Sequence, residues 1–280
     1  MNLNSHTPEP KIKFRKQMFG LSYGLAAGLA FSITLWGLDG YQLSRAYAYL
    51  PWTKFITGGA LAMLVCGFAG WLTSRLEKPL LGVFLWIAAA GVLAWLTILV
   101  PVVIAPAAMK LLVPELQPFL HYTFHANSEE MAGAAFAWIL IASFIIAAIQ
   151  VPMIEQATFS ISIFGQIAPH LICAFLMLVS GSVTDNLNNK PLRDPLLSMN
   201  DTIQFTLDNK GKEVDTKVAR ELHLASLRPV QDLITAERRM VVSRFDSLLE
   251  NVTILINFDG NWVECGTSFA HPLNCKAINP

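Results

Sequence analysis

The chain has 280 residues, of which 54% are hydrophobic and only 14% are charged, and its formal net charge is zero. Soluble domains carry about a quarter charged residues, so the composition argues against water as the only solvent of this chain. The mean hydropathy of +0.47 agrees with that conclusion. Without net positive charge or a long basic cluster, the sequence gives no indication of nucleic-acid binding.

The charges are unevenly distributed along the chain. Residues 1–181 hold 9 Lys and Arg and 7 Asp and Glu, whereas residues 182–280 hold 11 and 13. The last third therefore has the composition of an ordinary soluble domain. The expected fold class is a membrane all-α bundle followed by a small α+β domain.

Five stretches of the first part contain no Asp, Glu, Lys or Arg. A charge at the bilayer centre costs several kcal/mol, and about 20 apolar residues cross a hydrocarbon core of roughly 30 Å. Each stretch therefore predicts a transmembrane helix, and five of them disfavour the alternative of buried helices in a soluble protein. The predicted spans lie near residues 17–38, 55–74, 80–103, 131–151 and 158–181.

The third uncharged stretch is longer than one crossing needs. Pro101 and Pro106 lie in its last part, and a proline removes a helical donor and clashes with the preceding turn. We expect this span to end near Val103. The next segment, residues 111–124, is apolar but interrupted by two prolines, so we expect a short amphipathic helix on the outer membrane surface or a plug over the bundle.

The basic residues near the span ends indicate the orientation of the helices. With five spans, those on the N-terminal side are Lys11, Lys13, Arg15, Lys16, Arg75 and Lys78, and those in the opposite short loops are Arg45, Lys54 and Lys110. Because cytoplasmic loops carry the excess of basic residues, residues 1–16 are expected to form a cytoplasmic tail. An odd number of spans then makes the C-terminal domain extracytoplasmic.

The four cysteines fit this topology. Cys66 and Cys173 fall within predicted spans, where a thiol acts as a small apolar group. Cys265 and Cys275 lie in the C-terminal part and can form a disulfide in an oxidising compartment. A metal-binding pair is the alternative, but the spacing fits no common zinc pattern.

Small residues recur every four positions in two of the predicted spans. Gly20, Gly24 and Gly28 form such a ridge in the first span, and the second span has Ala62, Cys66 and Gly70. Spacing of this kind allows close approach of two helices, so the three glycines are predicted to be helix-packing residues. Glycine and alanine are also common in membrane helices generally, and the ridge could equally face a second protein.

A polar face runs along the predicted fifth span. Ser162, Gln166, His170 and Cys173 follow each other at helical spacing, so they share one side of a helix. Polar groups at that depth face protein or a water-filled cavity. Hydrogen bonding between helices is the favoured interpretation over a ligand or proton site, because no acidic residue lies in any span.

A second polar group, formed by His121, His125 and Glu129, has the spacing of a helical metal site. A helix N-cap at residues 127–128, with Glu129 in the first turn, explains the acidic residue better, so no metal is assigned.

Within the spans His170 is the single histidine, which excludes a bis-histidine haem inside the chain. No nucleotide-binding, hydrolase or metalloprotease motif is present, and no cofactor is expected.

The C-terminal part begins with an Asn- and Pro-containing stretch, residues 182–200, which predicts a linker. Residues 203–207 alternate like a strand that ends in a turn at 208–211, and residues 213–226 show a helical face. Further strands are predicted around residues 240–242 and 252–258, in an α+β domain over residues 201–280. A two-residue hairpin turn at 259–260 pairs strand positions 256 with 263 and 254 with 265, which places these four side chains on the covered face.

These features favour a non-enzymatic membrane component, an accessory, assembly or sensor protein whose extracytoplasmic domain contacts a partner. Its expected surroundings are the lipid bilayer and either another membrane or extracytoplasmic protein or further copies of itself. A small-solute or ion transporter using the fifth-span polar face is the first alternative. An outer-surface membrane enzyme is the second, although the sequence shows no catalytic constellation.

Overall fold

The computed structural model divides into two compact units, which are described separately. The helical unit comprises the described residues of Met1–Trp36, Ile56–Thr97 and Ala132–Leu187, and the mixed unit those of Gly37–Phe55, Ile98–Met131 and Asn188–Pro280. The structure describes residues 9–43, 50–76, 78–112, 124–125, 128–159, 163–209, 215, 217, 224–226, 238–246, 251–258, 261–268 and 271–278.

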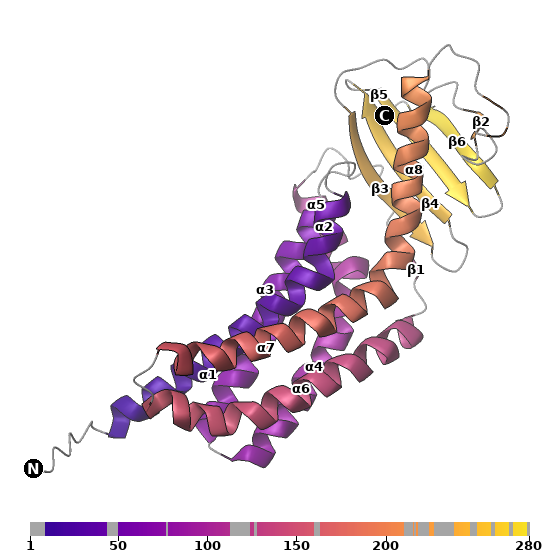
Figure 1. Cartoon of the computed structure of the whole chain (residues 1–280). Helices are drawn as coiled ribbons and strands as arrows, with labels where there is room; N and C mark the ends of the chain where they lie inside the picture. Colours follow the sequence, from indigo (N-terminus) through magenta and orange to yellow (C-terminus); the bar gives the residue numbers. More distant parts are fainter. Residues whose placement is uncertain are drawn as a thin grey trace, which may run out of the picture. The chain divides into compact units, whose positions relative to one another are not determined.

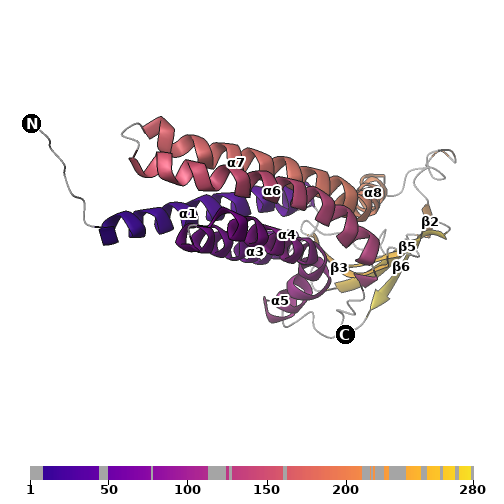
Figure 2. The ribbon, with the colours of Figure 1, turned by 90° about the horizontal axis from the view of Figure 1, so that it is seen from below.

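Long helices supply the helical unit, and Figures 1 and 2 show them running alongside one another. They are α1 (Glu9–Ser32), α3 (Leu50–Leu76), α4 (Pro79–Leu99), α6 (Ser128–Phe159) and α7 (Ile163–Thr184). Large apolar side chains cover their outer surface: Phe84 is 66% exposed and Phe164 is 76% exposed. Apolar side chains turned outward over several helices fit a hydrocarbon surrounding rather than water.

Four helical segments are long and apolar enough to cross a membrane, so this is an integral membrane protein. They run over Lys11–Leu43, Trp52–Leu76, Leu80–Met109 and Ile163–Asn189. The predicted span at residues 131–151 lies within α6, where the apolar stretch Ala135–Gln150 is shorter than the other four. The coarse prediction of a membrane helical bundle is therefore confirmed.

The helix boundaries differ from the predicted ones in two places. Helix α1 begins at Glu9, so the second half of the predicted tail is helical. The predicted end of the third span near Val103 is wrong, because α4 continues through a π-helical turn (Val100–Ile104) into α5 (Ala105–Leu112). A π-turn changes the backbone hydrogen-bonding pattern around Pro101, so that the proline does not end the helix.

Residues 182–200, predicted as a linker, are helical. Helix α7 runs into a π-helical turn (Asp185–Asn189) and then into α8 (Lys190–Asp208). The predicted strand at residues 203–207 is wrong for the same reason. In α8 the buried side chains recur at helical spacing, with Leu196, Met199 and Ile203 on one face, and the short alternation around Ile203 is part of that pattern.

A sheet belongs to the mixed unit, and its long strands β3 to β6 are drawn in gold to yellow in Figure 1. Its order is β1-β3-β4-β5-β6-β2, with antiparallel pairing from β3 to β6 and short parallel pairs at both edges. The strands are β1 (Phe124–His125), β2 (Leu224–Ser226), β3 (Arg238–Asp246), β4 (Asn251–Phe258), β5 (Asn261–Ser268) and β6 (His271–Ile278). The C-terminal part is therefore an antiparallel sheet preceded by a helix.

The register of this sheet confirms the predicted hairpin pairing. Ile256 pairs with Val263 and Ile254 pairs with Cys265, and all four side chains are fully buried. The turn residues at 259–260 lie outside the described part. The helical face predicted over residues 213–226 is wrong at β2, because the three residues of β2 form a strand. Most of the other residues of that face lie outside the described part of the chain.

Candidate functional site

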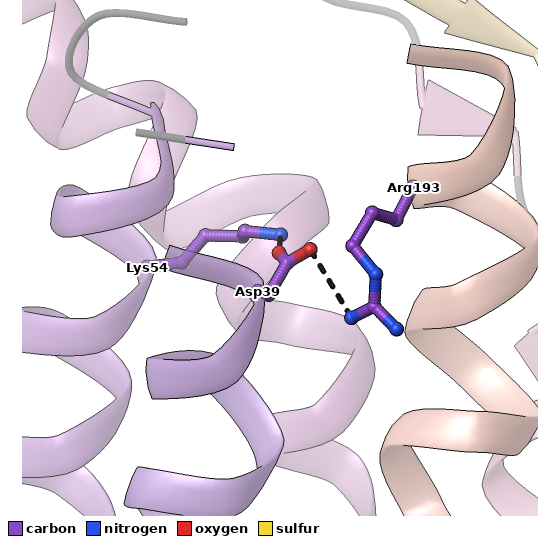
Figure 3. Close-up of polar contacts among 3 residues, drawn as sticks. All are labelled: Asp39, Lys54 and Arg193. Atoms are coloured by element: carbon purple, nitrogen blue, oxygen red, sulfur yellow. Dashed lines mark hydrogen bonds and ion pairs between the residues drawn. The ribbon is translucent and has the colours of Figure 1, made fainter. Parts of the chain in front are cut away.

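Three charged side chains of the mixed unit meet below its surface, and Figure 3 shows them together. Asp39 is in the first turn of α2 (Leu38–Leu43), Lys54 is near the start of α3, and Arg193 is in the first turns of α8. Lys54 donates a hydrogen bond to Oδ2 of Asp39. A guanidinium nitrogen of Arg193 lies 3.7 Å from the other carboxylate oxygen, Oδ1. We call these three residues the charge cluster.

All three side chains of the charge cluster are withdrawn from solvent. Asp39 is 1% exposed, and Lys54 and Arg193 are 7% and 8% exposed. Removing a charge from water costs several kcal/mol, and an opposite charge at short range offsets this cost only while both partners stay in place. Each member of the cluster therefore fixes the position of the others, and α8 is fastened to the ends of α2 and α3.

The sequence places Arg193 at the cluster through the helical period of α8. Arg193, Leu196, Met199 and Ile203 follow at intervals of three and four residues and are all buried, as one face of a helix requires. Pro191 lies at the second position of α8, where the missing amide hydrogen of a proline costs least. The composition that suggested a linker is thus compatible with a helix start.

Sequence reasoning missed the charge cluster because it treated Asp39 as the limit of an uncharged run and Lys54 as one of the basic residues that indicate orientation. Both residues flank consecutive predicted spans on the same side, and their charges are opposite. That arrangement is a usable signal for an ion pair at one membrane boundary. Arg193 had no such signal, because its position depends on the fold of a distant segment.

The polar face of the predicted fifth span lies on α7, in the helical unit. Ring nitrogen Nδ1 of His170 lies 3.1 Å from the carbonyl oxygen of Gln166, and Nε2 lies 2.9 Å from Oγ of Ser22 on α1. The thiol of Cys173 points to the carbonyl oxygen of Tyr23 at 3.9 Å. Since a carbonyl can only accept, Nδ1 of His170 carries a hydrogen. Ser162 lies outside the described residues.

Aromatic rings of α1 surround the same histidine. The ring centroid of Phe19 lies 4.7 Å and that of Tyr23 lies 5.9 Å from the His170 ring, both edge-on. His170 is half-buried, while Ser22 is exposed at the outer surface of α1. The polar face of α7 thus makes hydrogen bonds and ring contacts with one neighbouring helix.

The three spaced glycines of α1 lie directly against α3. A Cβ atom added to Gly24 would collide with the carbonyl group of Cys66, and one added to Gly28 would lie 2.6 Å from the carbonyl carbon of Ala62. Gly20 is similarly close to Gly70. The backbones therefore approach each other closely, with α1 and α3 running in opposite directions.

A buried polar network that sequence reasoning missed joins α3, α4 and α6. The side-chain oxygen of Gln150 accepts a hydrogen bond from the indole nitrogen of Trp86 at 2.6 Å. Its amide nitrogen donates to the carbonyl oxygen of Gly70 at 2.8 Å and lies 3.2 Å from Oγ of Ser74. An isolated glutamine in an otherwise apolar predicted span was the available signal. The network connects α6 to two helices that are long enough to cross a membrane.

The remaining candidate positions are more scattered. His125 lies in strand β1 and Glu129 in the first turn of α6, so the helical spacing considered for a metal site does not exist, and His121 lies outside the described part. Over the residues that the structure describes, no group of three or more His, Cys, Asp or Glu could hold a metal ion. Cys265 and Cys275 form a disulfide between β5 and β6, which confirms that prediction.

No family model, curated protein or solved structure matches this chain. Its function is therefore argued from the contacts of its own residues.

Proposed function

We propose that the chain is a non-enzymatic membrane component, an accessory, assembly or sensor protein that contacts a partner through an extracytoplasmic C-terminal domain. The observation that carries the proposal is the charge cluster. Asp39 fastens α8 to α2 and α3 through buried charges, and α8 leads along the chain toward the disulfide-bonded sheet. Such an arrangement suits a helix that precedes a partner-binding domain and must keep its own position.

In this proposal α6 is the fourth of five crossings. Its hydrogen bonds support this assignment, because Gln150 bonds to residues of α3 and α4, and the hydroxyl group of Tyr23 on α1 donates to the carbonyl oxygen of Ile146 on α6 at 3.1 Å. With five crossings the two termini lie on opposite sides, and the positive-inside rule assigns the N-terminus to the cytoplasm. A disulfide in the sheet fits an oxidising compartment.

Extraction of the full chain from its native membrane in mild detergent, followed by native mass measurement, tests the proposed function. We expect a partner in fixed stoichiometry, either a second protein or further copies of the chain, that is lost when Asp39→Asn releases α8. Glu264→Gln is the control, since Glu264 makes an exposed ion pair with Lys276 on the sheet. A strictly monomeric chain without any partner would contradict the proposal.

Transport of a small solute or ion is a second candidate, favoured by the pair of Ser22 and His170 between two membrane-spanning helices. Flux through vesicles that contain the purified chain would have to disappear in His170→Ala. The matched control is Thr184→Ala, because the Thr184 hydroxyl donates to the backbone carbonyl of Ser180 within α7. Absence of flux for every solute class offered would reject this candidate.

A further inference from the structure

An apolar groove lies between α1 and α3 within the helical unit. Its volume is about 310 Å³, close to the lower limit of about 300 Å³ for ligand pockets. The lining is entirely apolar and includes Leu21 and Leu25 of α1 and Leu64, Phe68 and Trp71 of α3. Leu64 and Phe68 are 66% and 60% exposed, so the groove opens outward, toward the side that faces lipid.

One of the lining residues is a glycine, Gly67. Gly67 contributes no side chain, and a Cβ atom added there would lie 3.1 Å from Cδ2 of Leu25 and 3.4 Å from Cδ1 of Leu21. The neighbouring groups are thus the ends of flexible side chains, whereas the spaced glycines of α1 face backbone atoms. Gly67 also belongs to the close contact of the two helices, because a Cβ atom added to Gly24 would lie 2.8 Å from the Cα atom of Gly67. A side chain at Gly67 would therefore push the ends of Leu21 and Leu25 into the groove.

Positive charges gather at one end of the groove. The guanidinium carbon of Arg75 lies 5.2 Å from the ring centroid of Trp71, which lines the groove. Gly20 of α1 adjoins Ser74 of α3, so the N-terminal turns of α1 lie at the same end as Arg75. Two further exposed cations, Lys13 and Arg15, are in those turns.

The shape of the groove favours a chain-like occupant. Its lining covers one turn of α1 and nine residues of α3, from Met63 to Trp71, whose eight steps correspond to about 12 Å at 1.5 Å per residue. A helix with a diameter of about 10 Å needs a wider and longer contact. An acyl chain fits an apolar groove of this size, and an anionic headgroup complements the cations at its end.

We propose that this groove binds one acyl chain of an anionic phospholipid, with the phosphate group held by Arg75 and attracted to the same end of the groove by the further cations of α1, Lys13 and Arg15. Van der Waals contact of the acyl chain with the leucine and aromatic side chains of the groove supplies the affinity, because the chain is already in an apolar surrounding before it binds. The cations supply the preference for a negatively charged headgroup. The site is independent of the charge cluster and of any partner of the C-terminal domain.

Native mass spectrometry of the full, delipidated chain in detergent tests this site. Dioleoyl-phosphatidylglycerol and dioleoyl-phosphatidylcholine, which share their acyl chains and differ in headgroup charge, are titrated separately. We expect one phosphatidylglycerol molecule to bind more tightly than phosphatidylcholine. In Arg75→Gln the affinity for phosphatidylglycerol should fall about fivefold, the effect of one cation near an anionic headgroup, while the affinity for phosphatidylcholine stays unchanged.

Two further variants locate the bound lipid. Gly67→Leu fills the groove and should abolish binding of both lipids, whereas Gly133→Leu, where an added Cβ meets nothing within 4 Å, should leave binding unchanged. Lys190→Gln is the control for charge, because Lys190 is exposed and lies outside the helical unit. Arg75 is exposed as well, so its variant remains informative even if Gly67→Leu fails to fold.

Three results would overturn the proposal. The parent chain could bind both lipids equally, which would remove the role of the cations. Lipid binding could survive in Gly67→Leu as well as it does in Gly133→Leu, which would place the lipid elsewhere. A dimer that excludes lipid and dissociates in Gly67→Leu would show that a second copy of the chain occupies the groove.

Discussion

The contacts within the helical unit differ in kind from those within the mixed unit. In the helical unit, glycines bring the backbones of α1 and α3 together, and an uncharged network around Gln150 joins three helices. In the mixed unit, a charge cluster around Asp39 fixes α8, and a disulfide joins neighbouring strands. The contacts between helices that are described for the helical unit are uncharged, whereas the mixed unit adds ionic and covalent contacts to its sheet.

The surroundings of each unit explain this difference. In hydrocarbon the hydrophobic effect does not drive helices together, so close packing and hydrogen bonds must do so. Charges are too costly at the bilayer centre but are tolerated near a boundary when they are paired. We expect substitutions in the mixed unit to act through lost charge pairing or lost covalent restraint, and substitutions in the helical unit to act through packing.

Asp39→Asn should have the largest effect. It leaves Lys54 and Arg193 buried without the carboxylate between them, and loss of one member of a buried ion pair costs about 3–5 kcal/mol. The free energy of unfolding, measured with denaturant in mild detergent, should fall by that amount. Glu264→Gln, at an exposed pair, should change it by less than about 1 kcal/mol; equal effects of both variants would contradict the role of the cluster.

Removal of the disulfide should have the next largest effect and should be confined to the sheet. Replacement of Cys265 and Cys275 by serine frees a short loop, for which disulfides stabilise by about 2–4 kcal/mol. Amide hydrogen exchange should accelerate in β5 and β6 while exchange in α1 and α3 stays unchanged. Faster exchange in the helices as well would show that the two units do not unfold separately.

Gly24→Ala tests the contact between α1 and α3. The added methyl group would meet the carbonyl group of Cys66, a backbone group that cannot rotate away, and overpacking of this kind costs about 1–3 kcal/mol. Thermal unfolding in detergent should show a lowered midpoint. Gly133→Ala is the matched control, since its site is open; an unchanged midpoint in Gly24→Ala would mean that the helices can move apart without cost.

Gln150→Leu should have the smallest effect of the series. It removes the acceptor of the Trp86 indole and the donor to Gly70, and hydrogen bonds between membrane helices contribute about 0.6 to 1.7 kcal/mol. Ser143→Ala on the same helix should cost nothing, because the buried Ser143 hydroxyl makes no hydrogen bond to any described residue. Chemical unfolding of both variants distinguishes the network from general packing of α6.

Local patterns in the sequence predicted the elements that depend on nearby residues. Uncharged runs identify helices because every residue of a span meets the same surroundings. The pairing of Ile254 with Cys265 follows from a two-residue turn and the period of two in strands. Near Pro101 the same reasoning failed, because proline ends an isolated helix but a π-turn accommodates it here.

The candidate site could be predicted only in part, because it depends on long-range packing. Asp39 and Lys54 are near neighbours in sequence, whereas Arg193 joins them only because α8 forms with its charged residue on the buried face. The Asn- and Pro-containing start of α8 has poor intrinsic helix propensity. Burial of Leu196 and Ile203, which follow Arg193 at helical spacing, compensates for that.

The most direct test of the five-crossing topology is labelling from one side of the membrane. Lys11→Cys on α1 and Asp201→Cys on α8 place exposed thiols before the first and after the last of the five proposed crossings. The parent chain, whose free Cys66 and Cys173 are buried, gives the background labelling. A membrane-impermeant maleimide should label Asp201→Cys in intact cells and Lys11→Cys only after permeabilisation. Labelling of both variants under the same condition would mean an even number of crossings and would contradict an extracytoplasmic C-terminal domain opposite a cytoplasmic N-terminus.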